Sequence, residues 1–313
     1  MDKVSVFSGN ANIELAQEIC SFLKVKLSDA LVTAFSEGEI RVKINENVRG
    51  KDVFIVQPTC PPTNNNLMEL LIMCDALRRS SAKRITAVMP YFGYARQDRK
   101  DQPRVPITAK LVANLLTTAG ANRILTMDLH AQQIQGFFDI PVDHLYAIGV
   151  FCDYFARTDK EDNMVIVSPD VGSIKMARAY ATRLRATFAV IDKRRESPEK
   201  TEVMNLLGEV RGKHAIIVDD LIATGGSLIE AVEALKSAGA KSVRAGISHG
   251  VLSGPAIDRI KACKDLDELI ITDSIPLVGE RRISKIKVLS VAGLMGEAIK
   301  RIHNEESISC LFD

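Results

Sequence analysis

Short runs of β-branched and other apolar residues alternate along the chain with longer stretches whose apolar residues recur at helical spacing. After the opening strand KVSVF, the runs are 52–57, 84–92, 123–130, 164–170, 187–192, 214–220, 242–249, 268–274 and 285–291. Several are apolar along their whole length, which is typical of strands buried on both faces of a parallel sheet that helices cover. Between them, residues such as Leu67, Leu70, Cys74 and Leu77 keep helical spacing. The pattern predicts an α/β protein built from βαβ units.

Two segments interrupt this rhythm. Residues 38–52 alternate polar and apolar positions with a period of two, which predicts a small antiparallel flap outside the main sheet. Residues 157–163 are charged and precede a new strand, so we expect a domain boundary there. The predicted parts are an N-terminal domain (1–156), a C-terminal domain (157–291), and a closing helix and tail (292–313) that pack back on the N-terminal domain. Both halves repeat the βαβ rhythm, so the two domains are predicted to be similar, each a mainly parallel sheet flanked by helices.

Composition supports this division and argues against nucleic-acid binding and membrane-spanning functions. A chain of 313 residues exceeds the size that one core usually serves, which favours two domains of about 150 residues each. The net charge of +2, from 41 basic and 39 acidic side chains, gives no field that would attract nucleic acid or a membrane surface. No apolar run approaches the length of a membrane-spanning helix. Six scattered cysteines, with no CxxC pair and no secretory leader, predict reduced thiols in the cytoplasm.

The most informative segment is 218–228, VDDLIATGGSL, which follows an apolar run and precedes a helical pattern. Its stretch 224–227 supplies two glycines, two hydroxyl groups and a helix start, which together can form a phosphate cradle. A bare Thr-Gly-Gly-Ser is also a common turn, but the acidic pair before it, Asp219 and Asp220, favours a ligand site. Carboxylates accept hydrogen bonds, so their expected partners are sugar hydroxyls or a divalent cation. The segment predicts a phosphorylated sugar lying across a strand end.

Other predicted strands also end in polar residues, and the carboxyl ends of parallel strands share one edge of a sheet. The loop 94–104 carries basic side chains that suit a polyphosphate, and its Gln97 can read a base or a hydroxyl; the alternative is a solvated surface loop. His130 lies close to Asp128 and is either a metal ligand or a hydrogen-bonded structural histidine. Asp170 ends an apolar run and precedes a glycine and a serine, which favours ligand contact over a simple helix cap.

Two common nucleotide motifs are absent from the sequence. There is no GxxxxGK[ST] phosphate loop, so a nucleoside triphosphate would have to be held in another way. No GxGxxG opens a helix after the first strand, so a dinucleotide enzyme of the usual kind is not expected.

Three further motifs are more specific than the cradle: YARQDRK (94–100), DLHAQQIQGFF (128–138) and IDKRR (191–195). With VDDLIATGGSL, they make the chain resemble the ribose-phosphate diphosphokinases, or phosphoribosyl pyrophosphate synthetases, of the phosphate-activated class. The likeness covers nearly the whole length. It implies two phosphoribosyltransferase-like domains and a reaction that uses Mg²⁺. In that reaction the anomeric hydroxyl of ribose 5-phosphate attacks the β-phosphorus of ATP, giving 5-phosphoribosyl 1-diphosphate and AMP.

The resemblance also implies roles for individual residues. The implied ligands of ribose 5-phosphate are Arg195, Asp219, Asp220, Ala223, Thr224, Gly225, Gly226 and Ser227, with the phosphate on 224–227 and the ribose hydroxyls facing the acidic pair. The implied ATP ligands are Phe35, Glu37, Gly38, Glu39, Arg96 and Gln97, of which Phe35, Glu37 and Glu39 reach the adenine from a neighbouring subunit. Lys193 and Arg195 are the implied catalytic cations, and His130 and Asp170 the implied metal ligands. The resemblance further implies a cytoplasmic homohexamer built from dimers, with phosphate and ADP as regulators.

The chain departs from the family pattern in places that bear on turnover and regulation. Ala223 stands where Asp is usual, Ser227 replaces Thr, Ser173 replaces glycine, and residues 196–200 read ESPEK where a more basic or neutral loop is expected. One alternative is a catalytically weak regulatory paralogue, which is expected to lose the loop cations or the metal residues, all present here. The other is a purine phosphoribosyltransferase, which would be shorter and would not need YARQDRK or IDKRR.

Overall fold

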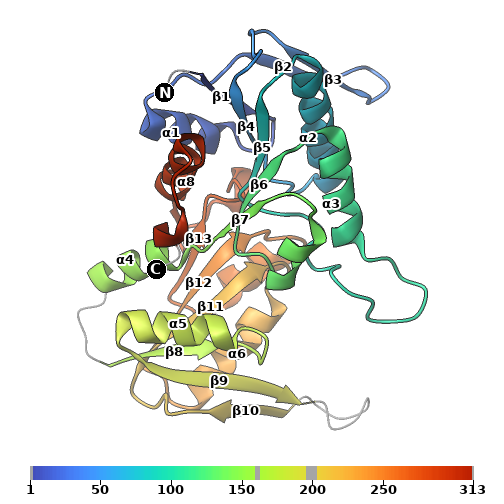
Figure 1. The fold of residues 1–313 in the computed structure, drawn as a ribbon. Helices are drawn as coiled ribbons and strands as arrows, with labels where there is room; N and C mark the ends of the chain where they lie inside the picture. Colours follow the sequence, from blue (N-terminus) through green and yellow to red (C-terminus); the bar gives the residue numbers. More distant parts are fainter. Residues whose placement is uncertain (1–2, 159–162, 195–202, 312–313) are drawn as a thin grey trace. The chain divides into compact units, whose positions relative to one another are not determined.

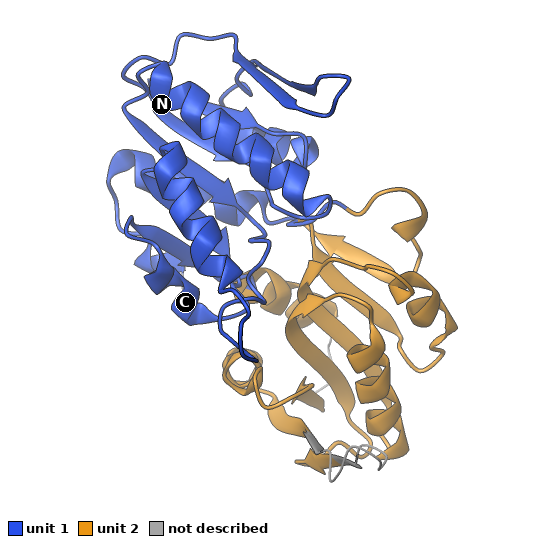
Figure 2. Ribbon diagram, turned by 90° about the vertical axis from the view of Figure 1, so that its right-hand side faces the viewer, with its two compact units in different colours: residues 1–147, 274–276, 290–313 blue, residues 148–273, 277–289 orange. Residues whose placement is uncertain are grey.

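The computed structural model describes residues 3–158, 163–194 and 203–311, and it describes the side chains of these residues except at 193, 194, 203 and 204. The chain forms two compact units (Figure 2). Unit 1 comprises residues 1–147, 274–276 and 290–313, and unit 2 comprises residues 148–273 and 277–289. The chain therefore builds most of unit 1, then unit 2 with a short return to unit 1 at 274–276, and ends in unit 1 with its last helix.

Unit 1 is built on a five-stranded parallel sheet with the order β1-β4-β5-β6-β7. The strands are β1 (Val4–Ser8), β4 (Asp52–Val56), β5 (Arg84–Met89), β6 (Arg123–Met127) and β7 (Val142–Leu145). Helices α2 (Thr63–Arg79) and α3 (Thr108–Ala119) cover one face, and α1 (Ile13–Leu23) and α8 (Ala292–Asn304) cover the other (Figure 1). Short 3-10 turns follow β6 (η1, Gln132–Phe137) and α8 (η3, Ser309–Leu311). Every residue of β4 is buried because helices cover both faces of the sheet.

The predicted flap is present as an antiparallel hairpin of β2 (Ala30–Ala34) and β3 (Ile40–Ile44). Residues of β3 are alternately half-buried and exposed, as a period of two requires. The predicted bounds are wrong, because only β3 falls within 38–52 and Asp52 already begins β4. The pairing strand β2 was missed because its residues are mostly exposed and its apolar alternation is weak.

Unit 2 contains a seven-stranded sheet with the order β10-β9-β8-β11-β12-β13-β14, parallel except for the β9–β10 pair. The strands are β8 (Met164–Ser168), β9 (Thr187–Arg194), β10 (Val203–Leu207), β11 (His214–Ile222), β12 (Ser242–Gly250), β13 (Glu268–Thr272) and β14 (Ile286–Leu289). The helices are α4 (Ile148–Thr158), α5 (Ile174–Leu184), α6 (Gly226–Ser237), α7 (Ala256–Ala262) and the 3-10 turn η2 (Gly279–Arg281). Each apolar run named in the sequence contains a strand, which confirms the α/β fold; β7 and β10 were not predicted.

Helix α4, the first element of unit 2, and helix α8, near the C-terminus, belong to different units. In unit 2, α4 packs the rings of Phe151 and Phe155 against Gly246 of β12, where a Cβ would lie 3.0 Å from Phe155 Cζ. This unit therefore begins at Ile148, ahead of the charged segment 157–163. In unit 1, α8 lies against α1, and Arg84 Nη2 donates to the carbonyl oxygen of Ile302 at 2.9 Å.

Two expectations from composition can be compared with the structure. The six cysteines are free thiols, and four of them are buried. Among the helices of the described ranges, none is both long enough and apolar enough to cross a membrane.

A buried polar network holds the loop between β1 and α1. Gln57 is 0% exposed; its Nε2 donates to Glu69 Oε2 at 2.8 Å, and its Oε1 accepts from the Ala11 N–H at 3.1 Å. Glu69 Oε1 also accepts from Asn10 Nδ2 at 2.7 Å. A Cβ on Gly9 would lie 2.4 Å from Gln57 Oε1, so this close approach requires glycine.

We expect Gly9→Ala to destabilise the protein by about 1–3 kcal/mol, the usual cost of overpacking a filled site. The reason is that Gln57 cannot move away without breaking its buried hydrogen bonds. Thermal unfolding measures the effect, with Gly136→Ala as the matched control, since nothing lies within 4 Å of a Cβ at that position. Equal losses in the two variants would show that the contact with Gln57 does not matter.

Candidate functional site

The strand, turn and helix predicted at 218–228 are present in unit 2. Strand β11 ends at Ile222, and α6 begins at Gly226 with Gly225 as its N-cap residue. Gly225 has a φ of +77°, a left-handed conformation that glycine adopts without strain. Thr224 and Ser227 are exposed on this turn, whereas Ala223 is half-buried. The turn therefore presents hydroxyl groups at the start of a helix, an arrangement suited to an anion.

Strands β8 and β11 are neighbours in the sheet, and this brings Asp170 and Asp219 to one site. Ser173 is the link between them. Its Oγ donates to Asp219 Oδ1 at 2.7 Å, and its N–H donates to Asp170 Oδ1 at 3.0 Å. Gly172 N–H donates to the same Asp170 oxygen at 2.8 Å. One oxygen of Asp170 thus holds the turn before α5, whose N-cap residue is Ser173.

Asp219 is a buried carboxyl group of this site with a perturbed pKa. Burial, and next the negative charge of Asp220, raise its pKa to about 7. The hydrogen bond from Ser173 acts in the opposite direction and lowers this pKa. A buried carboxylate beside a second one is stabilised by hydrogen-bond donors or by a cation. The acidic pair is therefore suited to the hydroxyl groups of a sugar, as the sequence predicts, and the perturbed pKa marks a candidate functional residue.

In unit 1, the predicted metal residue His130 follows the end of β6. The chain turns sharply there, with Asp128 at a φ of +41°. Asp128 Oδ2 accepts from the N–H of Ala147 at 3.1 Å, and the N–H of Leu129 donates to His144 Nε2 at 2.9 Å. Asp128 is thus a structural carboxylate, and buried His144 fixes the backbone next to His130. Sequence reasoning missed His144; its only signal was a polar residue in a short apolar strand.

The predicted ATP ligands Arg96 and Gln97 lie on the loop between β5 and α3. Both side chains are exposed. Thr108 Oγ1 donates to Gln97 Oε1 at 2.6 Å, and the N–H of Gln97 donates to the Tyr94 carbonyl at 2.9 Å. Tyr94 has a φ of +67°, an unusual conformation for a residue with a side chain. The loop is therefore held at its start by a tight turn, while Arg96 remains open to a ligand.

Phe35, Glu37, Gly38 and Glu39 form the tip of the flap. The N–H of Phe35 donates to the Glu39 carbonyl at 2.8 Å, and Gly38 closes the turn with a φ of +93°. The Phe35 side chain is 46% exposed, and the Arg41 guanidinium lies 5.6 Å from its ring centroid. An exposed aromatic ring at the tip of a hairpin offers a stacking surface for a base.

The predicted catalytic cations fall at the edge of what is described. Lys193 lies on β9, where its backbone pairs with Met204 of β10, and its side chain lies outside the described residues. Arg195 lies outside them altogether. Of the other predicted residues, Asp170 and 219–227 lie in unit 2, whereas His130, Arg96, Gln97 and the flap tip lie in unit 1.

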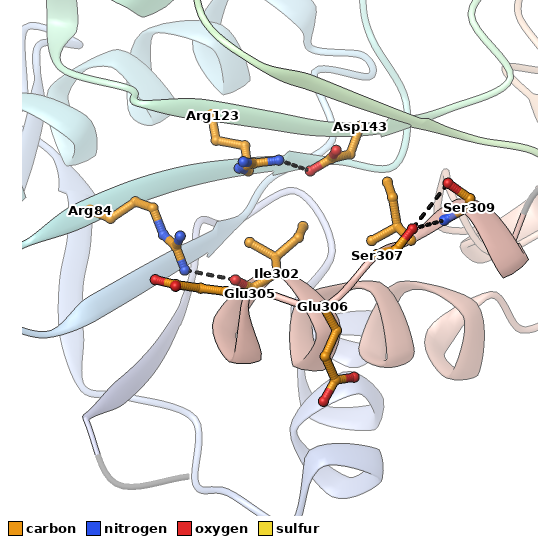
Figure 3. A pocket seen from close by; sticks show the side chains of 9 residues that line it. Arg84, Arg123, Asp143, Ile302, Glu305, Glu306, Ser307 and Ser309 are labelled. Atoms are coloured by element: carbon orange, nitrogen blue, oxygen red, sulfur yellow. Dashed lines mark hydrogen bonds and ion pairs between the residues drawn. The ribbon is translucent and has the colours of Figure 1, made fainter.

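A cavity of about 480 Å³ in unit 1 involves none of these residues. It lies at the amino ends of β5, β6 and β7, the edge of this sheet opposite the strand ends that precede Arg96 and His130. Arg123 Nη1 is paired with Asp143 Oδ2 at 2.6 Å, and Arg84 Nη2 donates to the carbonyl of Ile302 at 2.9 Å (Figure 3). Residues 305–309, after α8, line the other wall. Both arginines of the cavity already have carboxylate partners, Arg84 with Asp52 and Arg123 with Asp143.

Comparisons with known proteins identify the class. The N-terminal domain of ribose phosphate pyrophosphokinase matches residues 4–120, and the phosphoribosyl synthetase-associated domain matches residues 194–313. A solved phosphoribosylpyrophosphate synthetase from Mycobacterium smegmatis superposes with a TM-score of 0.92 at 42% identity, covering 97% of this chain and 100% of that one. The fold is thus that of a phosphoribosylpyrophosphate synthetase.

Full-length relatives agree with this class. A ribose-phosphate pyrophosphokinase from Caldanaerobacter subterraneus subsp. tengcongensis is 56% identical over 99% of this chain and 98% of its own length. One from Agrobacterium fabrum is 57% identical over 99% of this chain and 100% of its own length. The chain belongs to the ribose-phosphate pyrophosphokinase family.

Proposed function

We propose that the chain transfers the diphosphoryl group of ATP to the anomeric hydroxyl of ribose 5-phosphate, giving 5-phosphoribosyl 1-diphosphate and AMP. The observation that carries this proposal is the identity of 56% over 99% of the chain to a ribose-phosphate pyrophosphokinase. The turn at 224–227, at the edge of a parallel sheet, supports it because it combines a helix start with exposed hydroxyl groups. A purine phosphoribosyltransferase is not favoured, since the match extends over both halves of the chain.

In this proposal the 5-phosphate lies on residues 224–227. Backbone N–H groups and the hydroxyls of Thr224 and Ser227 donate to its oxygens, and the dipole of α6 favours its charge. Asp219 and Asp220 accept hydrogen bonds from the ribose hydroxyls, which orients the anomeric hydroxyl toward the transferring group. Arg96 and Gln97 contact ATP, and Phe35, Glu37, Gly38 and Glu39 form the adenine contact.

Mg²⁺ is the proposed metal ion, and it would neutralise the charge of the polyphosphate when bound. Asp170 offers the oxygen ligand that Mg²⁺ prefers, whereas His130 offers nitrogen and fits less well in direct contact. Among the residues described, no group of three or more His, Cys, Asp and Glu side chains gathers into a metal site. This suits Mg²⁺, which usually keeps several waters and takes the rest of its ligands from substrate phosphates.

Lys193 and Arg195 are the proposed catalytic cations, placed by the IDKRR motif to stabilise charge on the transferring group. The proposal includes a cytoplasmic homohexamer in which the flap tip of one subunit completes the ATP site of its neighbour. The exposed Phe35 ring supports that contact. Phosphate and ADP are the proposed regulators.

Release of AMP from ATP, measured with and without ribose 5-phosphate in the presence of Mg²⁺, tests the function. The expected result is AMP formation that requires both substrates. A protein that binds both substrates without turnover would be a regulatory paralogue. Consumption of 5-phosphoribosyl 1-diphosphate with a purine base, and no use of ATP, would identify a phosphoribosyltransferase instead.

The departure at Ala223 gives a further prediction. The carbonyl oxygen of Ala223 accepts from the N–H of Ser253 at 2.9 Å, so the backbone of the turn is held without help from the side chain. We therefore expect Ala223→Asp to change KM for ribose 5-phosphate by less than about tenfold, or 1.4 kcal/mol. Ala223→Ser is the uncharged control. If the natural protein turns over only after Ala223→Asp, the regulatory paralogue replaces the proposed function.

A further inference from the structure

We call residues 222–227 the phosphate turn, and three successive carbonyl groups at its start are held by residues 252–259 of unit 2. The N–H of Leu252 donates to the carbonyl of Ile222 at 3.1 Å, and the N–H of Ser253 donates to the carbonyl of Ala223 at 2.9 Å. The third carbonyl, that of Thr224, accepts instead from a side chain, Arg259 Nη1, at 3.0 Å. The first two contacts depend on the backbone, which many sequences can supply, whereas the third depends on one residue of α7.

The geometry of the peptide unit gives this contact a consequence. In a planar trans peptide the C=O and the following N–H point in opposite directions. When Arg259 holds the Thr224 oxygen on its own side, the N–H of Gly225 is therefore directed to the opposite side. Gly225 is in the left-handed region, with a φ of +77°, and glycine accepts more peptide orientations than other residues do. The hydrogen bond from Arg259 selects one of them.

The guanidinium also brings a permanent positive charge to the start of α6. Arg259 Nη1 lies 3.3 Å from the position that a Cβ on Gly226 would occupy. A guanidinium stays ionised throughout the physiological range, and a cation here adds to the favourable field of the helix terminus for an anion. Its charge and its hydrogen bond thus act on the same turn.

We propose that Arg259 is a positioning residue of the phosphate turn, which orients the Thr224–Gly225 peptide for the 5-phosphate of ribose 5-phosphate. This inference rests on the proposed function of that turn. Arg259 is 35 residues from Thr224 along the chain, and none of the sequence motifs includes it. Its effect is expected on the binding of the sugar phosphate, because the proposed ATP ligands, such as Phe35 and Arg96, belong to unit 1.

The test compares Arg259→Met, Arg259→Lys and the control Arg282→Met. Arg282 is also exposed, and its Nε also donates to a backbone carbonyl, that of Leu277, at 2.8 Å, but it does not hold the phosphate turn. Calorimetry measures the Kd of ribose 5-phosphate and of unphosphorylated ribose in the absence of ATP. Steady-state AMP release gives kcat and both KM values, and thermal unfolding reports on folding.

We expect Arg259→Met to raise the Kd and KM for ribose 5-phosphate about tenfold and to leave KM for ATP within about twofold. Arg259→Lys keeps the charge and should lose less affinity for ribose 5-phosphate. Millimolar guanidinium should partly restore the affinity of Arg259→Met. Arg282→Met should bind ribose 5-phosphate like the natural protein. Unchanged Kd for ribose 5-phosphate, equal effects on the two substrates, or equal effects of Arg282→Met would overturn the proposal. If Arg259→Met does not fold, the same measurements on Arg259→Lys decide.

The proposed function and the positioning role of Arg259 can fail separately. If the natural protein releases no AMP from ATP and ribose 5-phosphate, the proposed function fails. The calorimetric comparison does not depend on turnover, so it still shows whether Arg259 holds the turn for a sugar phosphate. If the natural protein is active and the Arg259 variants bind like it, only the positioning role is lost.

Discussion

Replacing Lys193 with alanine is expected to lower kcat by at least about a hundredfold while the Kd of ribose 5-phosphate changes little. A cation beside a transferring diphosphoryl group acts mainly on charge that develops in the transition state, so its loss appears in kcat. The backbone of Lys193 lies on β9, paired with Met204. Rapid measurement of AMP release gives kcat, and calorimetry gives the Kd of the sugar phosphate.

The control for this prediction is Lys213→Ala. Lys213 is another lysine of unit 2. Its Nζ donates to Thr187 Oγ1 at 3.0 Å, at the end of β9 opposite to Lys193. This variant should keep the natural kcat. An unchanged kcat in Lys193→Ala would mean that Lys193 belongs to a solvated basic turn, and the catalytic assignment would fall.

The second large effect is expected from Asp219→Asn, which should lower kcat/KM for ribose 5-phosphate about 10- to 100-fold. Hydrogen bonds to a charged group contribute about 1.5–3 kcal/mol, and the amide cannot replace the carboxylate in two such bonds to ribose hydroxyls. The substitution keeps an oxygen that can accept from Ser173 Oγ, a contact of 2.7 Å in the structure. The loss should therefore come from the ligand contacts. Steady-state kinetics measures the change in kcat/KM for ribose 5-phosphate. A decrease of less than about threefold would argue against a ribose contact.

The same variant should be more stable than the natural protein in the absence of ligands, and the gain should depend on pH. Burial and the charge of Asp220 raise the pKa of Asp219 to about 7, above its value of about 3.9 in the unfolded chain. The folded state then binds more protons than the unfolded state between these two values, so stability falls as pH rises through this range. Asparagine has no such charge to bury.

We expect the stabilisation by Asp219→Asn to be larger at about pH 8 than at about pH 5.5 by about 2 kcal/mol. Thermal and denaturant unfolding, with EDTA present and no substrate, measure the difference. A gain of equal size at both pH values would show that the carboxyl group is not perturbed in the folded protein.

The strands and turns that could be predicted from the sequence are those whose signal lies within a short contiguous stretch of residues. Apolar runs marked every strand from β4 to β14 except β7 and β10, because burial on both faces leaves a signal within five or six residues. The phosphate turn was visible for the same reason, since its glycines, hydroxyls and helix start are contiguous. Strand β2 was missed because an exposed hairpin strand leaves only a weak alternation.

What the sequence by itself determined is the α/β class, the positions of most strands, the phosphate turn and the family. Only the tertiary structure decided the strand order, which makes β8 the neighbour of β11 and so joins Ser173 to Asp219. It also decided that Arg259 reaches Thr224, and that a glycine is required beside buried Gln57. The physical reason is that the local pattern of residues sets which side chains are buried and where the chain forms a turn. The partner of a polar side chain depends instead on sheet register and helix packing between distant parts of the chain.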